Sequence, residues 1–191
     1  MAYQMYTTRA LVLSVRDRIG ADRMVRMYTE EAGMIDARAA GVREERSKMR
    51  YALQPFSSVR VTFVRGRREW RITGVEPERN FFLETTERAC RAGLVSLAKL
   101  LERFVRGEEE SRPLYNLVND AAHFLSEETH EDALRVLSLR MLHILGYVDA
   151  PAALVPLITA PNLATALSVC AADARASIDK QLGHVDTVSH L

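Results

Sequence analysis

The sequence lacks the features that mark membrane or secreted proteins. No run approaches the roughly 18 apolar residues of a membrane helix. No charged N-terminal region is followed by an apolar core, so we expect no secretory signal. Only two cysteines occur, Cys90 and Cys170, and they lie far apart in helical patterns. We therefore expect buried thiols in a reducing compartment, hence a cytoplasmic, nucleoid-associated protein without membrane contact.

Signals for catalysis and for metal binding are equally scarce. The five histidines never stand four residues apart, the spacing of a helical zinc site. The glycines form no phosphate-binding loop, and no serine has the setting of a nucleophile elbow. We expect no catalytic residue, no metal and no cofactor, which disfavours an enzyme.

What the sequence does carry is a segregated charge. Residues 1–79 hold 16 Lys and Arg against 10 Asp and Glu, whereas residues 80–191 hold 10 against 15. The net charge of +1 hides this difference. A basic half points to nucleic acid, and an acidic half points to protein packing or a protein partner.

The first half of the chain is typical of short β-strands. Apolar and polar residues alternate with period 2, and turn residues separate the runs. We expect strands at 11–16, 23–29, 34–40, 56–65 and 70–75. Five short antiparallel strands with one long connection between the third and fourth suit a small OB-type barrel, and an SH3-like barrel is the alternative.

After Pro77 the apolar period becomes that of helices. One helix carries a stripe from Cys90 to Val105, a second opens at 111–113, and a third covers about 131–145. A proline-punctuated irregular stretch follows at 149–160, then a final helix from about 161 to 183. The predicted class is α+β: an N-terminal five-stranded OB-fold barrel over 1–79, a nucleic-acid-binding domain, followed by an all-α helical domain over 80–191.

The long connection Gly41–Phe56 is the strongest functional signal. Cations crowd its start without an apolar period that would bury them, which predicts a loosely structured loop. Such cations release counterions when they meet phosphates, so the loop favours nucleic-acid binding. A solvated loop, partly neutralised by Glu44 and Glu45, is the alternative. Five cations fall within thirteen positions: Arg38, Arg43, Arg46, Lys48 and Arg50.

Other candidates flank this segment. Cations surround the first predicted turn and the last hairpin, where an OB barrel holds single strands. Of the four aromatic residues in the basic half that could stack on bases, Phe56 and Trp70 are better explained as core, and Tyr51 is the better stacking candidate. The further cations are Arg16, Arg18, Arg23, Arg65, Arg67 and Arg68, and the remaining aromatic is Tyr28.

Several strings, in order, resemble the bacterial RecO family of recombination mediators. The most specific is Ala-Gly-Val-Arg at 40–43, followed by a basic stretch and Ala-Leu-Gln-Pro-Phe at 52–56. The others are Thr-Arg-Ala-Leu-Val-Leu-Ser at 8–14, Asp-Arg-Met-Val-Arg-Met-Tyr-Thr-Glu-Glu-Ala-Gly at 22–33, and a helical run that ends in Leu-Gly-Tyr at 145–147.

The resemblance implies an OB fold followed by helices, and a function without covalent chemistry. Members bind single- and double-stranded DNA, anneal complementary strands and help load RecA with RecR. They also contact the acidic C-terminal tail of the single-stranded-DNA-binding protein. Carried over, Arg43, Arg46, Lys48 and Arg50 become the leading DNA contacts, and Arg135 and Arg140 become candidates for the tail.

One departure is clear. Many members carry a four-cysteine zinc module after Leu-Gly-Tyr, whereas residues 148–156 contain no cysteine. We therefore expect no zinc there. Two other functions stay open from the sequence: a protein-interaction adaptor whose basic half docks an acidic partner, and an RNA-binding OB protein.

Overall fold

A computed structural model describes residues 5–67, 69–149 and 151–188, with side chains as far as residue 183. The chain divides into two compact units. The first comprises Met1–Thr85 and Val105–Tyr115, and the second comprises Thr86–Phe104 and Asn116–Leu191. The connection between α3 (Arg88–Phe104) and α4 (Arg112–Glu127) thus belongs to the same unit as the strands.

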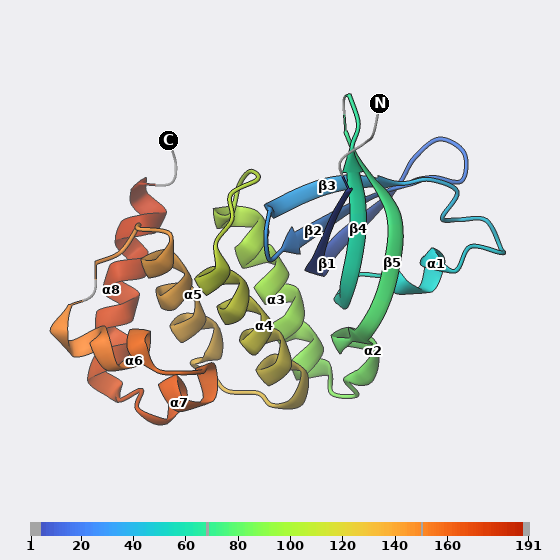
Figure 1. Ribbon diagram of the computed structural model, residues 1–191. Coiled ribbons are helices and arrows are strands. Elements are labelled where there is room, and N and C mark those ends of the chain that lie inside the picture. The colour runs from blue at the N-terminus through green and yellow to red at the C-terminus, as the bar shows by residue number, and fades with distance from the viewer. Residues whose placement is uncertain (1–4, 68, 150, 189–191) are drawn as a thin grey trace. The chain divides into compact units, whose positions relative to one another are not determined.

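The β unit is a closed five-stranded barrel with strand order β1-β2-β3-β5-β4, which confirms the predicted OB-type architecture (Figure 1). All neighbours are antiparallel except β3 and β5, and β1 closes the barrel against β4. The strands are β1 (Met5–Asp17), β2 (Arg23–Thr29), β3 (Gly33–Ala39), β4 (Ser57–Arg65) and β5 (Trp70–Asn80).

Two strands are longer than the sequence pattern indicated. β1 begins at Met5, because its first residues pair with the end of β4. β5 runs past Pro77, which faces Val59 where the β4–β5 register shifts. A proline is tolerated at such an irregularity because the missing N–H interrupts no regular ladder.

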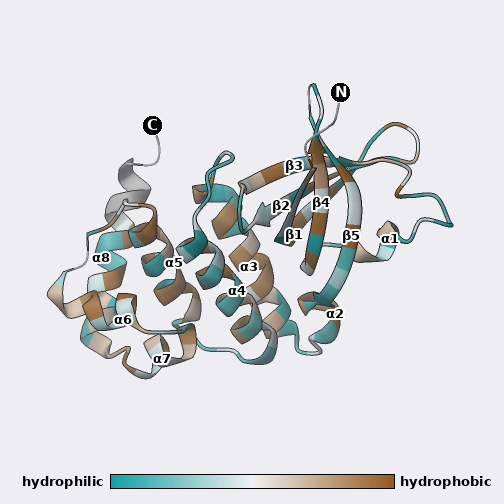
Figure 2. Ribbon diagram, in the orientation of Figure 1, coloured by the Kyte–Doolittle hydropathy of each residue, from teal (hydrophilic) through white to brown (hydrophobic). Residues whose placement is uncertain are grey.

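Alternation along the strands turns one set of side chains into the barrel. Val25, Met27, Ile35, Val59 and Val61 are essentially inaccessible. Burying a side chain of this size contributes roughly 1.5–3 kcal/mol. Figure 2 shows hydrophobic bands on the strands, whereas the outer part of the connection between β3 and β4 is hydrophilic.

Apart from the short helix α1 (Met49–Ala52) between β3 and β4, the described helical elements follow β5. The long helices bury the apolar stripes that the sequence predicted, among them Cys90, Leu94 and Leu97 on α3. Among the helices that the structure describes, none combines the length and apolar character needed to cross a bilayer. The elements are α2 (Phe81–Glu84), α3 (Arg88–Phe104), α4 (Arg112–Glu127), α5 (Ala133–Ile144), η1 (Ala152–Leu154), α6 (Val155–Thr159), α7 (Leu163–Ser168) and α8 (Ala172–Val188).

The C-terminal part corrects three expectations. The stretch 149–160 is not irregular, because η1 and α6 form there with Pro156 in the first turn of α6, a position proline favours. The single helix expected over 161–183 is two helices, α7 and α8. Ser168 bonds the carbonyl of Thr165, a local bond that competes with helix continuation. Gly183 does not end α8, which continues to Val188.

Candidate nucleic-acid interface

The segment between β3 and β4 is fastened to the barrel at its start. The N–H of Gly41 donates to Asp22 Oδ1 at 2.8 Å, and the N–H of Arg43 donates to the Ala21 carbonyl at 2.9 Å. Between them Val42 is fully buried in the barrel core. The Gly41 N–H and the Arg38 guanidinium hold the pKa of Asp22 below its usual value. The first turn of the segment is therefore built on the β1–β2 loop.

The other end is fastened by the Leu-Gln-Pro-Phe string. Leu53 is fully buried in the barrel core, and it follows a short helix, α1 (Met49–Ala52). Phe56 has a φ of 66°, and its N–H donates to the Val12 carbonyl at 2.7 Å. A non-glycine residue in this region costs about 1–3 kcal/mol and persists only where its surroundings fix it. Its ring stacks on Phe82 at 5.3 Å.

Between these anchors the charged side chains point outward. The Arg46 side chain is 91% exposed, and its ion pair is with Glu44, two residues away. Lys48 and Arg50 are exposed, and Arg50 lies over the ring of Tyr51 at 5.9 Å. Arg43 donates to the Gly20 carbonyl at 3.2 Å and lies 3.8 Å from Asp17. The expectation of a loosely structured loop is wrong, since Val42, Ala52 and Leu53 bury an apolar side.

The cations of the β1–β2 loop have carboxylate partners. Arg18 donates to Glu69 at 2.6 Å, and Arg23 donates to Asp17 at 2.8 Å. Arg16 is exposed on the outer side of β1. The Arg18 guanidinium, followed by that of Arg38, holds the pKa of Glu69 below its usual value. The Arg18–Glu69 pair ties the β1–β2 loop to the residue before β5, and the Arg23–Asp17 pair joins the end of β1 to the start of β2.

The β4–β5 hairpin supplies two described cations. Arg65 is largely exposed, lies over the Trp70 ring at 5.1 Å, and has a carboxylate of Glu108 at 3.5 Å. Arg67 is exposed near the tip. Arg68, also a predicted contact, lies outside the described residues.

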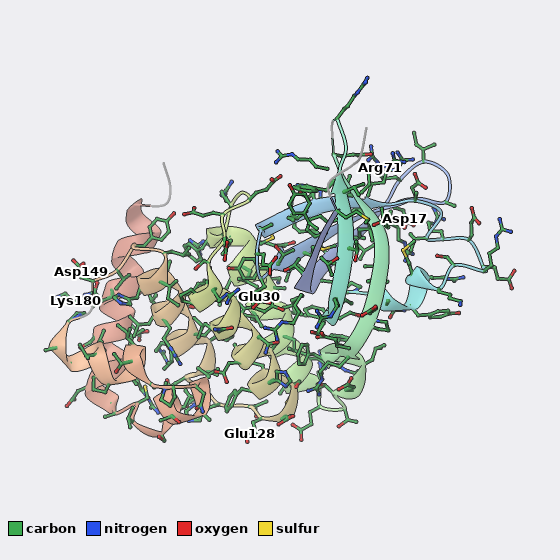
Figure 3. The ribbon with its side chains drawn as sticks, viewed as in Figure 1. Asp17, Glu30, Arg71, Glu128, Asp149 and Lys180 are labelled. Carbon is green, nitrogen blue, oxygen red and sulfur yellow. The ribbon has the colours of Figure 1, made fainter. Side chains whose placement is uncertain are left out.

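Sequence reasoning missed a row of side chains that crosses the sheet. Arg16 of β1 is in register with Met24 of β2, Met24 with Arg38 of β3, and Arg38 with Arg71 of β5. Arg38 also pairs with Asp22 and Glu69. Figure 3 labels Arg71, which lies at the start of β5. The signal was available, because alternation on β3 turns Ala37 and Ala39 inward and Arg38 outward.

The aromatic candidates separate by burial. Tyr28 is 1% exposed and its ring lies 6.1 Å from that of Tyr115, and burial raises the pKa of both, that of Tyr115 to about 12. Trp70 is buried in the barrel core, whereas Phe56 is only half-buried and lies outside that core, so their interpretation as core residues holds for Trp70 and not for Phe56. Tyr51 is 70% exposed beside Arg50. Only Tyr51, of these four, offers a ring face to a base.

The two cations proposed for an acidic tail lie in the helical unit with internal partners. Arg135 donates to Asp179 at 2.7 Å and also to Asp132. Arg140 is half-buried, and its Nη2 donates to the Ala160 carbonyl at 2.7 Å. Burial lowers the pKa of Arg140, and its buried Nη1 has no hydrogen-bond partner among the described residues.

In the part of the chain that the structure describes, no group of three or more His, Cys, Asp or Glu side chains is arranged to hold a metal ion. Cys90 is buried and Cys170 partly buried, and both are thiols. What the barrel presents is a set of cations on the β1–β2 loop, the 41–56 segment, the β4–β5 hairpin and a sheet face, with an exposed Tyr51 among them. Such a surface fits a polyanion.

Comparison with known proteins gives a consistent picture. Residues 1–81 match the family model described as "Recombination protein O N terminal". The chain is 33% identical over 146 residues to the DNA repair protein RecO of Pelotomaculum thermopropionicum, covering 75% of this chain and 56% of that protein. It is 28% identical over 144 residues to the DNA repair protein RecO of Heliobacterium modesticaldum, covering 75% and 52%.

A third relative is more similar over a shorter span. The DNA repair protein RecO of Rubrobacter xylanophilus is 38% identical over 77 residues, which is 40% of this chain and 31% of that protein. The chain spans about half the length of the curated relatives it matches.

Proposed function

The chain belongs to the RecO family, and from this premise we propose that it is a non-enzymatic mediator of DNA repair and recombination. In this proposal it binds single- and double-stranded DNA, promotes annealing of complementary strands, and helps load RecA together with RecR.

The observation that carries the proposal is the outward charge of the anchored segment. Arg43, Arg46, Lys48 and Arg50 project from a backbone that buried apolar residues fix to the barrel. The carboxylate partners of Arg43 and Arg46, Asp17 and Glu44, are exposed, and pairs of that kind contribute about 1 kcal/mol or less. Phosphates can therefore replace those partners at small cost, and each phosphate neutralised releases counterions.

The outer sheet surface extends this site. Arg16, Arg38 and Arg71 lie in one row across β1, β3 and β5. In the proposal a strand runs from this row to the segment, and a base stacks on Tyr51. A surface that reads charge and ring faces discriminates little between sequences. It also suits annealing, because cations screen the repulsion between two phosphate backbones.

The protein partners belong to the same proposal. An acidic C-terminal tail of the single-stranded-DNA-binding protein would compete with Asp179 for Arg135, or contact the half-buried Arg140. Arg135 offers the more accessible group, because its side chain is 33% exposed. Replacing Arg135 should therefore weaken tail binding more than it changes DNA binding.

Salt dependence tests the proposal directly. Binding to single strands of unrelated sequence is measured by fluorescence anisotropy at about 50 mM and about 200 mM salt. If about four phosphates are neutralised, affinity should fall by about 50-fold over this range. Near-equal affinity at the two salt concentrations contradicts the proposal.

Two further arms separate the alternatives. Competition between matched DNA and RNA strands should favour DNA or show no preference, whereas strong RNA preference would support an RNA-binding OB protein. A peptide of the acidic tail should bind through the helical unit. Tail binding that maps to the 41–56 segment would favour the adaptor.

A further inference from the structure

An acidic strap, residues 105–111, lies against the barrel. It connects α3 to α4 and belongs to the same compact unit as the strands. The N–H of Met34 donates to the Gly107 carbonyl at 3.0 Å. Gly33 approaches the strap so closely that an added Cβ would lie 2.4 Å from the Glu109 carbonyl oxygen. The start of β3 is thus shaped to receive this strap (Figure 1).

Beside the strap, three aromatic rings lie together at one end of the barrel. We call this end, formed by Tyr6, Phe63 and Trp70, the mouth. Tyr6 stacks on Phe63 at 6.1 Å and meets Trp70 edge-on at 5.5 Å. Tyr6 is 38% exposed, so part of its ring is open to solvent, whereas Phe63 is fully buried. Arg65 lies over Trp70, with which it is paired across β4 and β5. A ring and a guanidinium therefore stand together at an accessible edge.

Glu108 of the strap occupies this mouth. Its Oε1 accepts a hydrogen bond from Trp70 Nε1 at 2.8 Å, and its Oε2 lies 3.5 Å from Arg65 Nη1. A largely buried indole N–H needs an acceptor, because leaving it unpaired costs about 1–3 kcal/mol. The carboxylate supplies that acceptor and also neutralises the arginine.

We infer that the mouth, together with Arg65, is a phosphate site for single-stranded nucleic acid, and that Glu108 occupies it in the unbound chain. The inference rests on the proposed function, which it deepens. A backbone phosphate takes the place of the Glu108 carboxylate, and an adjacent base lies on Tyr6.

The exchange is chemically balanced. A phosphate oxygen accepts from Trp70 Nε1 as the carboxylate does, so no buried donor is left unpaired. The side chains of Arg65 and Glu108 are 67% and 41% exposed, so the ion pair that must break is a weak one. Exposed Arg67 on the same hairpin is a further cation that a phosphate can meet. The strap thus competes with a ligand strand for one site.

The test compares two variants of equal charge. Glu108→Gln removes the negative charge but keeps an acceptor for the indole, and Glu110→Gln removes the same charge two residues further along the strap. Both are titrated with a homothymidine oligonucleotide at low salt, with anisotropy giving affinity. Trp70 is the sole tryptophan of the chain, so its emission reports on the mouth alone.

We expect Glu108→Gln to bind the strand about two- to fivefold more tightly than Glu110→Gln, and Trp70 emission to change on saturation. Binding by the wild type with equal affinities for the two variants, or with unchanged Trp70 emission, overturns the inference and leaves the proposed function standing. Failure of the wild type and of both variants to bind any strand overturns the proposed function and the inference with it.

Discussion

The segment at 41–56 and the contact between α5 and α8 both concentrate arginine but use it in opposite ways. In the helical unit, Arg135 and Arg175 converge on Asp132, whose side chain is fully buried. In the segment, Arg46 is 91% exposed and pairs only weakly with Glu44. The same residue type organises an interior in one place and faces solvent in the other. The partner's burial, not the number of arginines, separates the two roles.

The comparison predicts that the buried apolar anchors, and not the charged side chains, stabilise the 41–56 segment. Replacing the buried anchor by Leu53→Ala should lower the free energy of unfolding by about 3–4 kcal/mol, because it removes apolar contacts and leaves a cavity in the barrel. Urea unfolding followed by circular dichroism measures the loss. The matched control Arg50→Ala should stay within about 0.5 kcal/mol of the wild type. A larger cost for Arg50→Ala than for Leu53→Ala would reverse the assignment of roles.

The helical side of the comparison is probed by Asp132→Ala. Removing this carboxylate leaves two partly buried guanidinium groups without their shared partner, although Asp179 and Glu131 still pair with them. We expect a loss of about 3 kcal/mol in the free energy of unfolding, measured by the same method. Glu44→Ala, which removes an exposed partner of Arg46, should cost less than about 0.5 kcal/mol. Equal losses in the two variants would show that burial does not distinguish the pairs.

The proposed DNA-binding role of the segment is tested by replacing four of its cations together with alanine: Arg43, Arg46, Lys48 and Arg50. Affinity for single strands at low salt should fall about 10- to 100-fold, and the salt dependence should weaken, while the barrel stays folded. The control removes four exposed cations elsewhere: Arg88, Lys99, Arg112 and Lys180. Anisotropy titrations compare the two. A similar loss in both variants would mean that net charge alone drives binding.

The architecture was accessible from sequence because local patterns and the final fold agree. Period-2 alternation located five strands, and the long third connection indicated an OB barrel, which the closed strand order confirms. The break between α7 and α8 was not accessible, because residues 169–171 contain neither proline nor glycine. The ion pair of Arg175 with Asp132 joins segments distant in sequence, and such tertiary contacts override local propensity.

The site was only partly accessible for a related reason. The cations of the 41–56 segment are visible as a cluster in sequence, but Val42 and Leu53 read as isolated apolar residues until the barrel places them in its core. The row through Arg38 and Arg71 depends on the parallel pairing of β3 with β5. Register between strands 33 positions apart cannot be deduced from the alternation within each strand.

The smallest expected effect concerns Arg18 and Arg38, whose carboxylate partners are neither as buried as Asp132 nor as exposed as Glu44. The Gly41 N–H and Arg38 lower the pKa of Asp22, and Arg18 and Arg38 lower that of Glu69. A carboxyl group with a lowered folded pKa stabilises the fold above its ordinary value, here 3.8 for Asp22 and 4.5 for Glu69. That contribution is lost as the pH falls through the folded values. The thermal midpoint should therefore hold between about pH 7 and pH 5 and fall below about pH 4.

Arg38→Ala should flatten this acid-side decrease, since it removes a guanidinium that both carboxylates share. Arg46→Ala, in the segment, should leave the pH profile of the wild type unchanged. Thermal unfolding of the three proteins across this pH range measures both expectations. An equal flattening in both variants would place Arg38 with the solvent-facing cations. A flattened pH profile in Arg38→Ala but not in Arg46→Ala would place Arg38 with the structural arginines, even though all partners of Arg38 lie near the surface. Shared hydrogen bonds, and not depth below the surface, would then distinguish structural arginines from solvent-facing ones.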